Sequence, residues 1–595
     1  MGLLQKAVET YESHRNLIGV YHENGTVLAP IAHTVKKADI EITITAEGAF
    51  YDANTSCKGQ SIIIPVSVDS AGRAGKVIAP HPLCEQLGYL SPISPIKYDT
   101  YLAQLTQWLQ SDYSHPILQA IATYLQAGTI LTDLERVGII KLDTKGLKDS
   151  EKLMVRWRVI GLDDCEQEAC WKNEKLFDSF RSYYQTKLSG NNICMVTGND
   201  DIIARQHVKG IVSLAGNAKI ISSNDKSGFT YRGRFTDESQ ALTVGYEASQ
   251  KAHNALRWLV DTQGIQVVFG GRTFLCWNPQ GRLIPQPSYP FMPPAPPIFR
   301  PTEYKDSLQK VLNSKKSELK LTDGVVLAVF DAATTGRLSL TYYNELQAHD
   351  FLERLHDWDA SCCWPHRFDG IKPPTLLQIV NCAFGTQRDK WLETDDRVLR
   401  QQMQRLIACR VDKALIGADI VKALADRASR PMAYDHNIWE NILFTACAVI
   451  RKYRTDRFKE EWNMALEPEK KDRSYQFGRL LAVMEKAERD TYDSGEDREP
   501  NALRLQSIFC QRPLTTAHNL EKQLEKAYFP RLLRKYPNMY IKYKNLMGQI
   551  MGIISEFPQE DWDKPLNATY LMGYYLQRSA LYTKKTDNEM EENEQ

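Results

Sequence analysis

Residues 324–343 have the sequence GVVLAVFDAATTGRLSLTYY. Two apolar, β-branched runs, Gly324–Asp331 and Arg337–Tyr343, flank a Thr-Thr-Gly turn at 334–336, which predicts a β-hairpin. Upstream of this hairpin, strand and helix patterns alternate, whereas the patterns from about residue 345 onward are helical. The sequence therefore predicts an α+β multidomain protein, in which mixed α/β N-terminal and central regions are followed by a helical C-terminal bundle.

The length and the turn signals predict four domains, at roughly 100–200 residues per domain. Eight prolines make 285–301 an extended connector, and the acidic tail from 587 is expected to be disordered. The predicted domains are an α+β domain over 1–190, a β-rich central domain over 191–344 that includes the connector, a helical domain over 345–463 and a helical bundle over 464–595.

Local patterns predict individual elements within these domains. An amphipathic pattern predicts a helix over Leu3–Ser13, and strict alternation predicts a hairpin over Ile40–Tyr51. A long helical stretch over Tyr98–Gln126 is expected to break at Pro116, because proline removes a helical hydrogen bond. Near the end of the chain, Pro530–Ile554 predicts one continuous helix.

The composition is that of a globular protein, with 43% hydrophobic and 25% charged residues and a formal net charge of +1. Twelve cysteines without a CxxC pair are typical of a reducing cytoplasm and do not suggest a zinc site. The N-terminus lacks the apolar core of a signal peptide, and no apolar run approaches the ~20 residues that cross a bilayer. We therefore expect a cytoplasmic protein without a membrane partner.

A nearly neutral chain that binds nucleic acid must concentrate its cations on particular surfaces. The stretch 217–235, NAKIISSNDKSGFTYRGRF, has four cations and one acid, with short polar side chains and aromatic rings between them. Such residues suit phosphate contacts and stacking on bases, although a charged surface turn is the alternative. The candidate contacts here are Lys219, Asn224, Lys226, Phe229, Arg232 and Arg234.

A second basic stretch, 519–545, has seven cations and two acids, with tyrosines among them. Cations that follow a backbone with aromatic rings nearby are suited to a single strand of nucleic acid. The alternative is a solvated helix face with tyrosines in the core. The candidate contacts are Lys522, Lys526, Arg531, Arg534, Lys535, Lys542 and Lys544.

A series of motifs resembles the large subunit of the type I-C CRISPR surveillance complex (Cascade). The central motifs are Cys194–Gly198, His207–Gly210, the stretch 217–235 and Tyr246–Arg257. The similarity continues on both sides and covers most of the chain in the expected order, except for the connector at 285–301. The flanking matches are Ser70–Arg73, Ile78–Pro80, Leu83–Cys84, Gly88–Leu90, Gly336–Ser339 and Tyr475–Glu485.

The resemblance implies a non-enzymatic subunit without a cofactor. In such complexes a guide RNA supplies sequence specificity, and protein subunits recognise a short duplex tag, the PAM, in foreign double-stranded DNA. The large subunit is expected to contact the PAM through its N-terminal domain and to stabilise the R-loop and its displaced strand. Its implied partners are also the backbone subunits, the handle-binding subunit and a helicase-nuclease.

The resemblance also implies a small subunit that arises from an internal start codon and corresponds to the C-terminal bundle. Met464 is the candidate start, because it follows Lys459–Glu461, whose codons are purine-rich and could imitate a ribosome-binding site. The alternative is that Met464 is an ordinary linker residue.

The residues that would read the PAM are harder to place. Asn and Gln side chains can pair with adenine edges, and Lys or Arg with guanine. The candidates in the N-terminal domain are Lys36, Lys37, Asn54, Lys58, Gln60, Arg73 and Lys76.

Two enzymatic functions remain as alternatives. A guide-RNA processing endonuclease could use His207 or His253 as a catalytic group. An HD-type metal-dependent hydrolase could use His349-Asp350 and His356-Asp357. The two histidine–aspartate pairs are seven residues apart, about 10 Å along a helix, which is too far for one metal ion without further ligands. No P-loop, HExxH or GxSxG motif is present in the sequence.

Overall fold

The computed structural model describes residues 2–73, 77–163, 166–212, 216–221, 235, 240, 242–263, 268–320, 322–334, 336–493, 495–496 and 498–582. The chain forms two compact units, Met1–Ile284 with Gly324–Glu345, and Pro285–Asp323 with Leu346–Gln595. The predicted α+β fold class is confirmed. The finer division into four domains stays a prediction.

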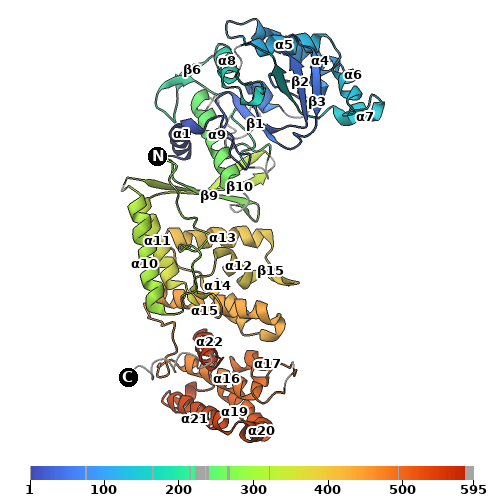
Figure 1. The fold of residues 1–595 in the computed structure, drawn as a ribbon. Coiled ribbons are helices and arrows are strands. Elements are labelled where there is room, and N and C mark those ends of the chain that lie inside the picture. Colours follow the sequence, from blue (N-terminus) through green and yellow to red (C-terminus); the bar gives the residue numbers. More distant parts are fainter. Residues whose placement is uncertain are drawn as a thin grey trace, which may run out of the picture. The chain divides into compact units, whose positions relative to one another are not determined.

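The hairpin at 324–343 is confirmed, and it completes a sheet of the first unit. Its strands, β10 (Gly324–Thr334) and β11 (Arg337–Gln347), are joined to β9 (Arg272–Trp277) and β8 (Val268–Phe269) in the order β11-β10-β9-β8. Helices α1 (Leu3–Ser13) and α9 (Tyr246–Gln263) lie side by side in the same unit (Figure 1) and share one apolar core with this sheet.

A second group of strands forms the N-terminal part of the first unit. The predicted hairpin at 40–51 is confirmed, and β2 also pairs in parallel with β5 to give the order β3-β2-β5. Two further strands, β1 and β4, form an antiparallel pair. The bounds are β1 (His33–Lys37), β2 (Ile40–Thr45), β3 (Phe50–Asn54), β4 (Ser61–Pro65) and β5 (Val155–Ile160).

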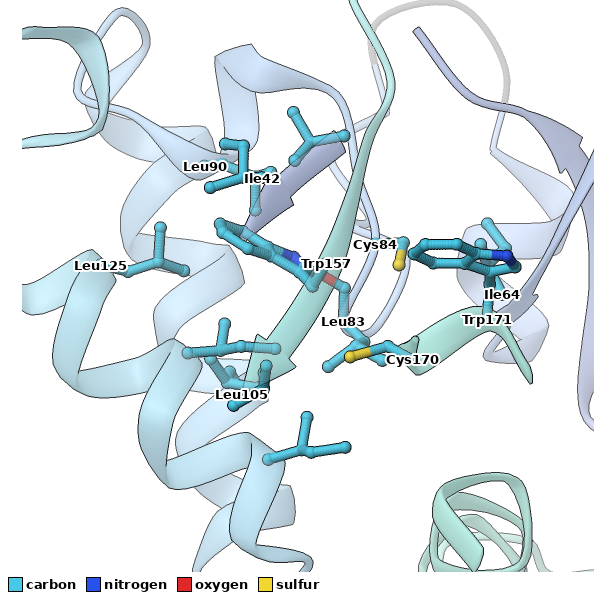
Figure 2. Packing of buried hydrophobic residues seen from close by; sticks show 14 of the residues in the cluster. Ile42, Ile64, Leu83, Cys84, Leu90, Leu105, Leu125, Trp157, Cys170 and Trp171 are labelled. Atoms are coloured by element: carbon cyan, nitrogen blue, oxygen red, sulfur yellow. The ribbon is translucent and has the colours of Figure 1, made fainter. Parts of the chain in front are cut away.

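The core beside this sheet is centred on Trp157, which is fully buried. Its indole Nε1 donates a hydrogen bond to the carbonyl oxygen of Leu83 at 3.0 Å, and Leu105 and Leu125 from two helices lie around the ring (Figure 2). Burial of large apolar side chains is the main stabilising term in such a core, and the bonded indole N–H avoids a desolvation cost.

The predicted break at Pro116 is confirmed, because separate helices α4 and α5 replace one long helix. Proline is the first residue of both helices, where its missing N–H costs nothing. The remaining elements of the first unit are α2 (Val68–Gly72), α3 (Leu87–Leu90), α4 (Pro95–Leu109), α5 (Pro116–Gln126), α6 (Ile130–Arg136), α7 (Thr144–Ser150), α8 (Glu174–Gln185), β6 (Asn191–Ile193) and β7 (Asp200–Ile202).

The second unit is mostly helical, but it also contains two short hairpins that the sequence patterns did not predict. These are β12 (Trp364–His366) with β13 (Gly370–Lys372), and β14 (Thr386–Arg388) with β15 (Trp391–Glu393). Its helices before the C-terminal bundle are α10 (Pro301–Glu318), α11 (Ala348–Ser361), α12 (Leu376–Phe384), α13 (Asp396–Val411), α14 (Ala418–Ala428) and α15 (His436–Phe458).

Prolines explain two differences from the predicted boundaries. Pro301, assigned to the extended connector, instead begins α10, which lies beside α11 (Figure 1). The continuous helix predicted over 530–554 is wrong: it is split into α20 and α21, and Pro537 begins the second helix. In both cases proline occupies the first helical position, where it starts a helix rather than continuing one.

The C-terminal bundle is built around a close contact of α16 and α22. A Cβ atom on Gly478 would lie 1.9 Å from the carbonyl oxygen of Tyr570, and one on Gly573 would lie 2.1 Å from that of Tyr475, so only glycine permits this approach. The elements of the bundle are α16 (Arg473–Arg489), α17 (Asn501–Arg504), α18 (Gln506–Phe509), α19 (Pro513–Gln523), a π-helical turn (Leu524–Tyr528), α20 (Phe529–Lys535), α21 (Pro537–Ile554) and α22 (Thr569–Tyr582). Among the described residues, no helix combines the length and apolar character needed to cross a bilayer.

Candidate nucleic-acid interface

A pocket of about 330 Å³ in the first unit collects basic side chains from four separate segments. They come from strand β1, the end of helix α2, the loop that follows β7, and helix α9. None of the described residues that line this basic pocket is an aspartate or a glutamate. The charged and imidazole side chains in its lining are Lys36, Arg73, Lys209, Arg257, His33 and His81.

Arg73 is fixed by a carboxylate that lies behind the pocket wall. Its Nη1 and Nη2 atoms donate to Glu85 Oε2 at 2.6 Å and Oε1 at 3.1 Å, and the Glu85 side chain is fully buried. Nη1 also donates to the carbonyl oxygen of Ala79, and the guanidinium lies 4.8 Å from the centre of the Tyr89 ring. Two faces of the guanidinium are therefore occupied by protein groups.

Arg257 is held in a similar way and links α9 to β1. Its Nη1 donates to Thr34 Oγ1 and its Nη2 to the carbonyl oxygen of Val35, each at 3.0 Å. Asp261 lies 4.0 Å from Nε. Burial lowers the pKa of Arg257, and the nearby carboxylate opposes that shift. This arginine is a rigid, positively charged wall of the basic pocket.

The two lysines of the pocket keep N–H groups available. Lys209 Nζ donates to the carbonyl oxygen of Arg73 at 2.6 Å, which leaves two of its three protons. Lys36 is exposed and forms no ion pair within the part of the chain that the structure describes. Desolvation by the surrounding protein and the charges of Arg257, Lys209 and Arg73 lower the pKa of Lys36, and the carboxylate of Glu85 opposes that shift. Desolvation and the charges of Lys219 and Arg73 likewise lower the pKa of Lys209. These cations repel one another, so an anion in the pocket would be stabilised.

The other predicted PAM contacts lie outside the basic pocket. Lys37 follows Lys36 on β1, so their side chains leave the strand on opposite faces, and Lys37 Nζ donates to Ser61 Oγ at 3.0 Å. The remaining three, Asn54, Lys58 and Gln60, are in or beside the turn that joins β3 to β4. Asn54 caps that turn by accepting a hydrogen bond from Ser56 N, and Gln60 Oε1 accepts one from Arg156 Nη1. Lys58 is exposed. Lys76 lies outside the described residues.

Only one candidate from the stretch 217–235 lies within the described residues. Lys219 forms a parallel bridge to β11: its N–H donates to the carbonyl oxygen of Gly336 at 3.2 Å, and its carbonyl accepts from Leu338 N at 3.0 Å. Its ammonium is close enough to lower the pKa of Lys209. The candidates outside the described residues are Asn224, Lys226, Phe229, Arg232 and Arg234.

The seven candidate cations of the stretch 519–545 divide into two groups. Lys544 pairs with Glu525, Lys535 Nζ lies 3.1 Å from Asp493 Oδ1, and Arg534 Nε donates to the carbonyl oxygen of Pro530. The other four are exposed, and in the described part of the chain they have no ion pair. They come from α19, the π-helical turn, α20 and α21, and are called the bundle cations below: Lys522, Lys526, Arg531 and Lys542.

The aromatic residues of this stretch belong mainly to the core. Tyr528, Phe529 and Tyr543 are buried, and the Tyr543 hydroxyl donates to Asp490 Oδ2 at 2.5 Å. Tyr536 is 45% exposed, with Lys535 Nζ 5.8 Å from its ring centre. The expectation that rings and cations together face a strand therefore fails for the buried rings, which pack inward because they cover the apolar sides of short helices.

The two candidate histidines for RNA cleavage lie together, with ring centres 5.9 Å apart. His207 Nδ1 is 2.9 Å from Ser249 Oγ, and His253 Nδ1 is 2.7 Å from the Ser249 carbonyl oxygen. Burial, with the charges of His253 and Lys219, lowers the pKa of His207 to about 3, and burial lowers that of His253 to about 4. In this arrangement both rings are uncharged near pH 7 and lie beneath the surface.

The candidate HD residues in α11 do not converge. Asp357 pairs with Lys413, and the next carboxylate, Asp359, forms a fully buried ion pair with Arg410 at 2.6 Å. Across the described residues, no group of three or more His, Cys, Asp or Glu side chains could hold a metal ion.

Met464, the candidate internal start, lies in the segment between α15 and α16. Its side chain is buried, with Sδ 3.5 Å from the Sγ atom of Cys363. The internal start stays a prediction.

The pocket residues and the bundle cations fall within one family match. Residues 8–582 match the family model described as CRISPR-associated protein (Cas_Csd1). Among curated proteins, no match was found. The matched range runs through both units and covers nearly the whole chain. The chain therefore belongs to the CRISPR-associated protein family Cas_Csd1.

Proposed function

We propose that this protein is the large subunit of a type I-C CRISPR surveillance complex and that it acts in the cytoplasm by binding nucleic acid, without cutting it. In this role it recognises the PAM in foreign double-stranded DNA, stabilises the R-loop and supports recruitment of the helicase-nuclease. Membership of the CRISPR-associated family supports the setting. One observation supports the nucleic-acid contact itself: a pocket lined by four cations and, among the described residues, by no carboxylate.

The basic pocket would bind an anion because holding like charges close together costs free energy. Lys36 and Lys209 have lowered pKa values because they are desolvated and lie close to other cations. A phosphate group would replace lost hydration with charge-assisted hydrogen bonds and would offset the repulsion. Backbone phosphates are the anions that lysine and arginine side chains neutralise when a protein binds nucleic acid.

The two units have separate tasks in this proposal. The first unit contacts the DNA where duplex is tested, and guide pairing then propagates from that point. The bundle cations of the second unit hold the displaced strand electrostatically, which requires exposed charge but no fixed geometry. Backbone and handle-binding subunits hold the guide RNA.

The test is reconstitution of the complex from guide RNA and the other subunits, with and without this chain. Binding is measured to a library of DNA duplexes with a randomised flank beside a fixed target. We expect one short flanking sequence to be enriched only when this chain is present, and no target cleavage until the helicase-nuclease is added. Equal enrichment without the chain, or cleavage by the complex alone, would overturn the proposal.

A further inference from the structure

The basic pocket is too small for a duplex. Its volume of about 330 Å³ lies at the lower end of the range for sites that hold a single small ligand. The dimensions therefore favour one nucleotide over a segment of double helix.

We propose that the basic pocket binds one unpaired nucleotide, with its phosphate between the ammonium groups of Lys36 and Lys209. The inference rests on the proposed function and adds to it that recognition in the first unit includes a nucleotide displaced from its strand. Proteins that extrude a nucleotide hold it in a fitted pocket of this kind, and the unpaired base is easiest to displace.

The lysines are the phosphate contacts because both arginines are already engaged. Arg73 gives two hydrogen bonds to Glu85, and Arg257 gives two to β1. Lys209 uses one proton on the Arg73 carbonyl and keeps two, and no ion pair of Lys36 is found among the described residues. The clamped guanidinium groups supply fixed positive charge, while the ammonium groups supply the free donors.

Two histidines of the lining give a second, independent indication of a ligand. His33 Nε2 and His81 Nδ1 are buried and have no hydrogen-bond partner in the described structure. The side chains belong to residues that are only 1% and 5% exposed, respectively. His33 Nδ1 is 2.9 Å from the Ile31 carbonyl oxygen, so the proton lies on Nδ1 and leaves Nε2 as an acceptor. A buried polar atom without a partner carries a desolvation cost, which a group bound in the pocket could offset.

The nucleotide could be part of a single strand or a free mononucleotide, and one experiment on the isolated full-length chain tests both. Equilibrium dialysis measures binding of adenosine 5′-monophosphate, adenosine, inorganic phosphate and a single-stranded oligothymidine. We expect the monophosphate and the oligonucleotide to bind and to compete, inorganic phosphate to compete weakly, and adenosine not to bind. The inference would be overturned if a duplex competed with the monophosphate as strongly as the single strand does. It would also be overturned if adenosine bound as tightly as its monophosphate.

Matched variants test the named contacts. The double variant Lys36→Gln with Lys209→Gln should weaken binding of the monophosphate about 10- to 100-fold, because charge-assisted hydrogen bonds are lost. Lys37→Gln, on the opposite face of the same strand, should change it less than about twofold. The variant Lys36→Arg with Lys209→Arg keeps the charge and should retain most binding, which separates loss of contact from misfolding. Unchanged binding by the Gln double variant would contradict the inference.

These measurements distinguish a wrong assignment of the pocket from a wrong proposed function. If the isolated chain binds no nucleotide but the assembled complex still needs this chain to select a flanking sequence, only the pocket assignment is wrong. If the complex selects the same flank without this chain, the proposed function is wrong whatever the pocket binds.

Discussion

The basic pocket of the first unit and the bundle cations of the second present positive charge in opposite ways. In the pocket, cations from four segments meet: Arg73, Lys209 and Arg257 are half-buried, whereas Lys36 is exposed. Two of them, Arg73 and Arg257, are clamped by Glu85 and by the backbone of β1. On the bundle, Lys522, Lys526, Arg531 and Lys542 extend from short helices into solvent. The first arrangement depends on geometry and costs folding free energy, whereas the second depends on charge alone.

The contrast implies different responses to the same change of conditions. Clamped, desolvated groups should respond steeply and locally to single substitutions and to pH, because each one is held by specific partners. Solvated cations should act nearly additively and should be sensitive to salt.

Acid should loosen the first unit far more than the bundle. His33, His207 and His253 are uncharged in the folded unit, with pKa values that burial lowers to about 4, 3 and 4. On unfolding they recover an ordinary pKa near 6.5 and take up protons below it. Stability is therefore complete above about pH 6.5 and is lost as the pH falls toward 4. Each histidine should cost about 2 kcal/mol between pH 7 and pH 5.

Hydrogen exchange by mass spectrometry at both pH values, corrected for intrinsic rates, checks this. Peptides from α9 should lose protection at pH 5, whereas those from α16 should not, because His518 is the bundle's one histidine and it is exposed. Equal loss in both helices would contradict the proposed cause.

Glu85→Gln should destabilise the first unit by about 3 kcal/mol or more, because the desolvated Arg73 guanidinium would lose its charged partner. The matched control is Asp493→Asn, which breaks the exposed pair with Lys535 and should cost less than about 1 kcal/mol. Denaturant unfolding of the full-length variants measures both. A Glu85→Gln effect as small as the control would show that Arg73 is not held as described.

In the assembled complex, Lys36→Gln and Lys209→Gln should be strongly non-additive. Each alone should remove most of the binding that depends on the basic pocket, an effect of about 10-fold or more on target affinity, because one phosphate bridges both groups. A double-variant cycle on target DNA measures the coupling. Additive effects would indicate that the two lysines act as separate solvated charges, as expected for the bundle.

Much of the fold could be predicted from the sequence, because the deciding signals are local. The hairpin at 324–343 and helix α1 follow directly from alternation and amphipathic spacing. Helix α10 was missed because a run of prolines precedes it and most of its side chains are polar. Its signal is the apolar spacing of Tyr304, Leu308 and Leu312, four residues apart, which becomes the buried face.

The candidate site could be predicted only in part, for a physical reason. The sequence predicts Lys36 and Arg73 individually, but nothing local indicates that Lys209 and Arg257 join them. They do so because α9 contacts β1 and the loop after β7 contacts the end of α2. Composition also could not show that Arg73 would be engaged by Glu85. The bundle cations were easier to find, since they lie within one short stretch of sequence.

The smallest effect per substitution is expected on the bundle, and it should be visible mainly as a change in salt dependence. A cation that contacts one phosphate of a single strand contributes about 0.7 to the slope of log affinity against log salt, which is about fourfold in affinity at 0.15 M salt. Stepwise replacement of Lys522, Lys526, Arg531 and Lys542 by Gln should therefore lower the slope in nearly equal steps.

Lys544→Gln is the matched control, because its ammonium is already paired with Glu525 and should add almost no slope. Titration of the displaced strand's binding between 0.05 and 0.3 M salt, over which the Debye length falls from about 14 Å to about 6 Å, measures all five variants. A slope that falls in one step at a single lysine, or that falls as much for Lys544, would mean that the bundle binds through a fixed site like that of the pocket, and the contrast between the two regions would be lost.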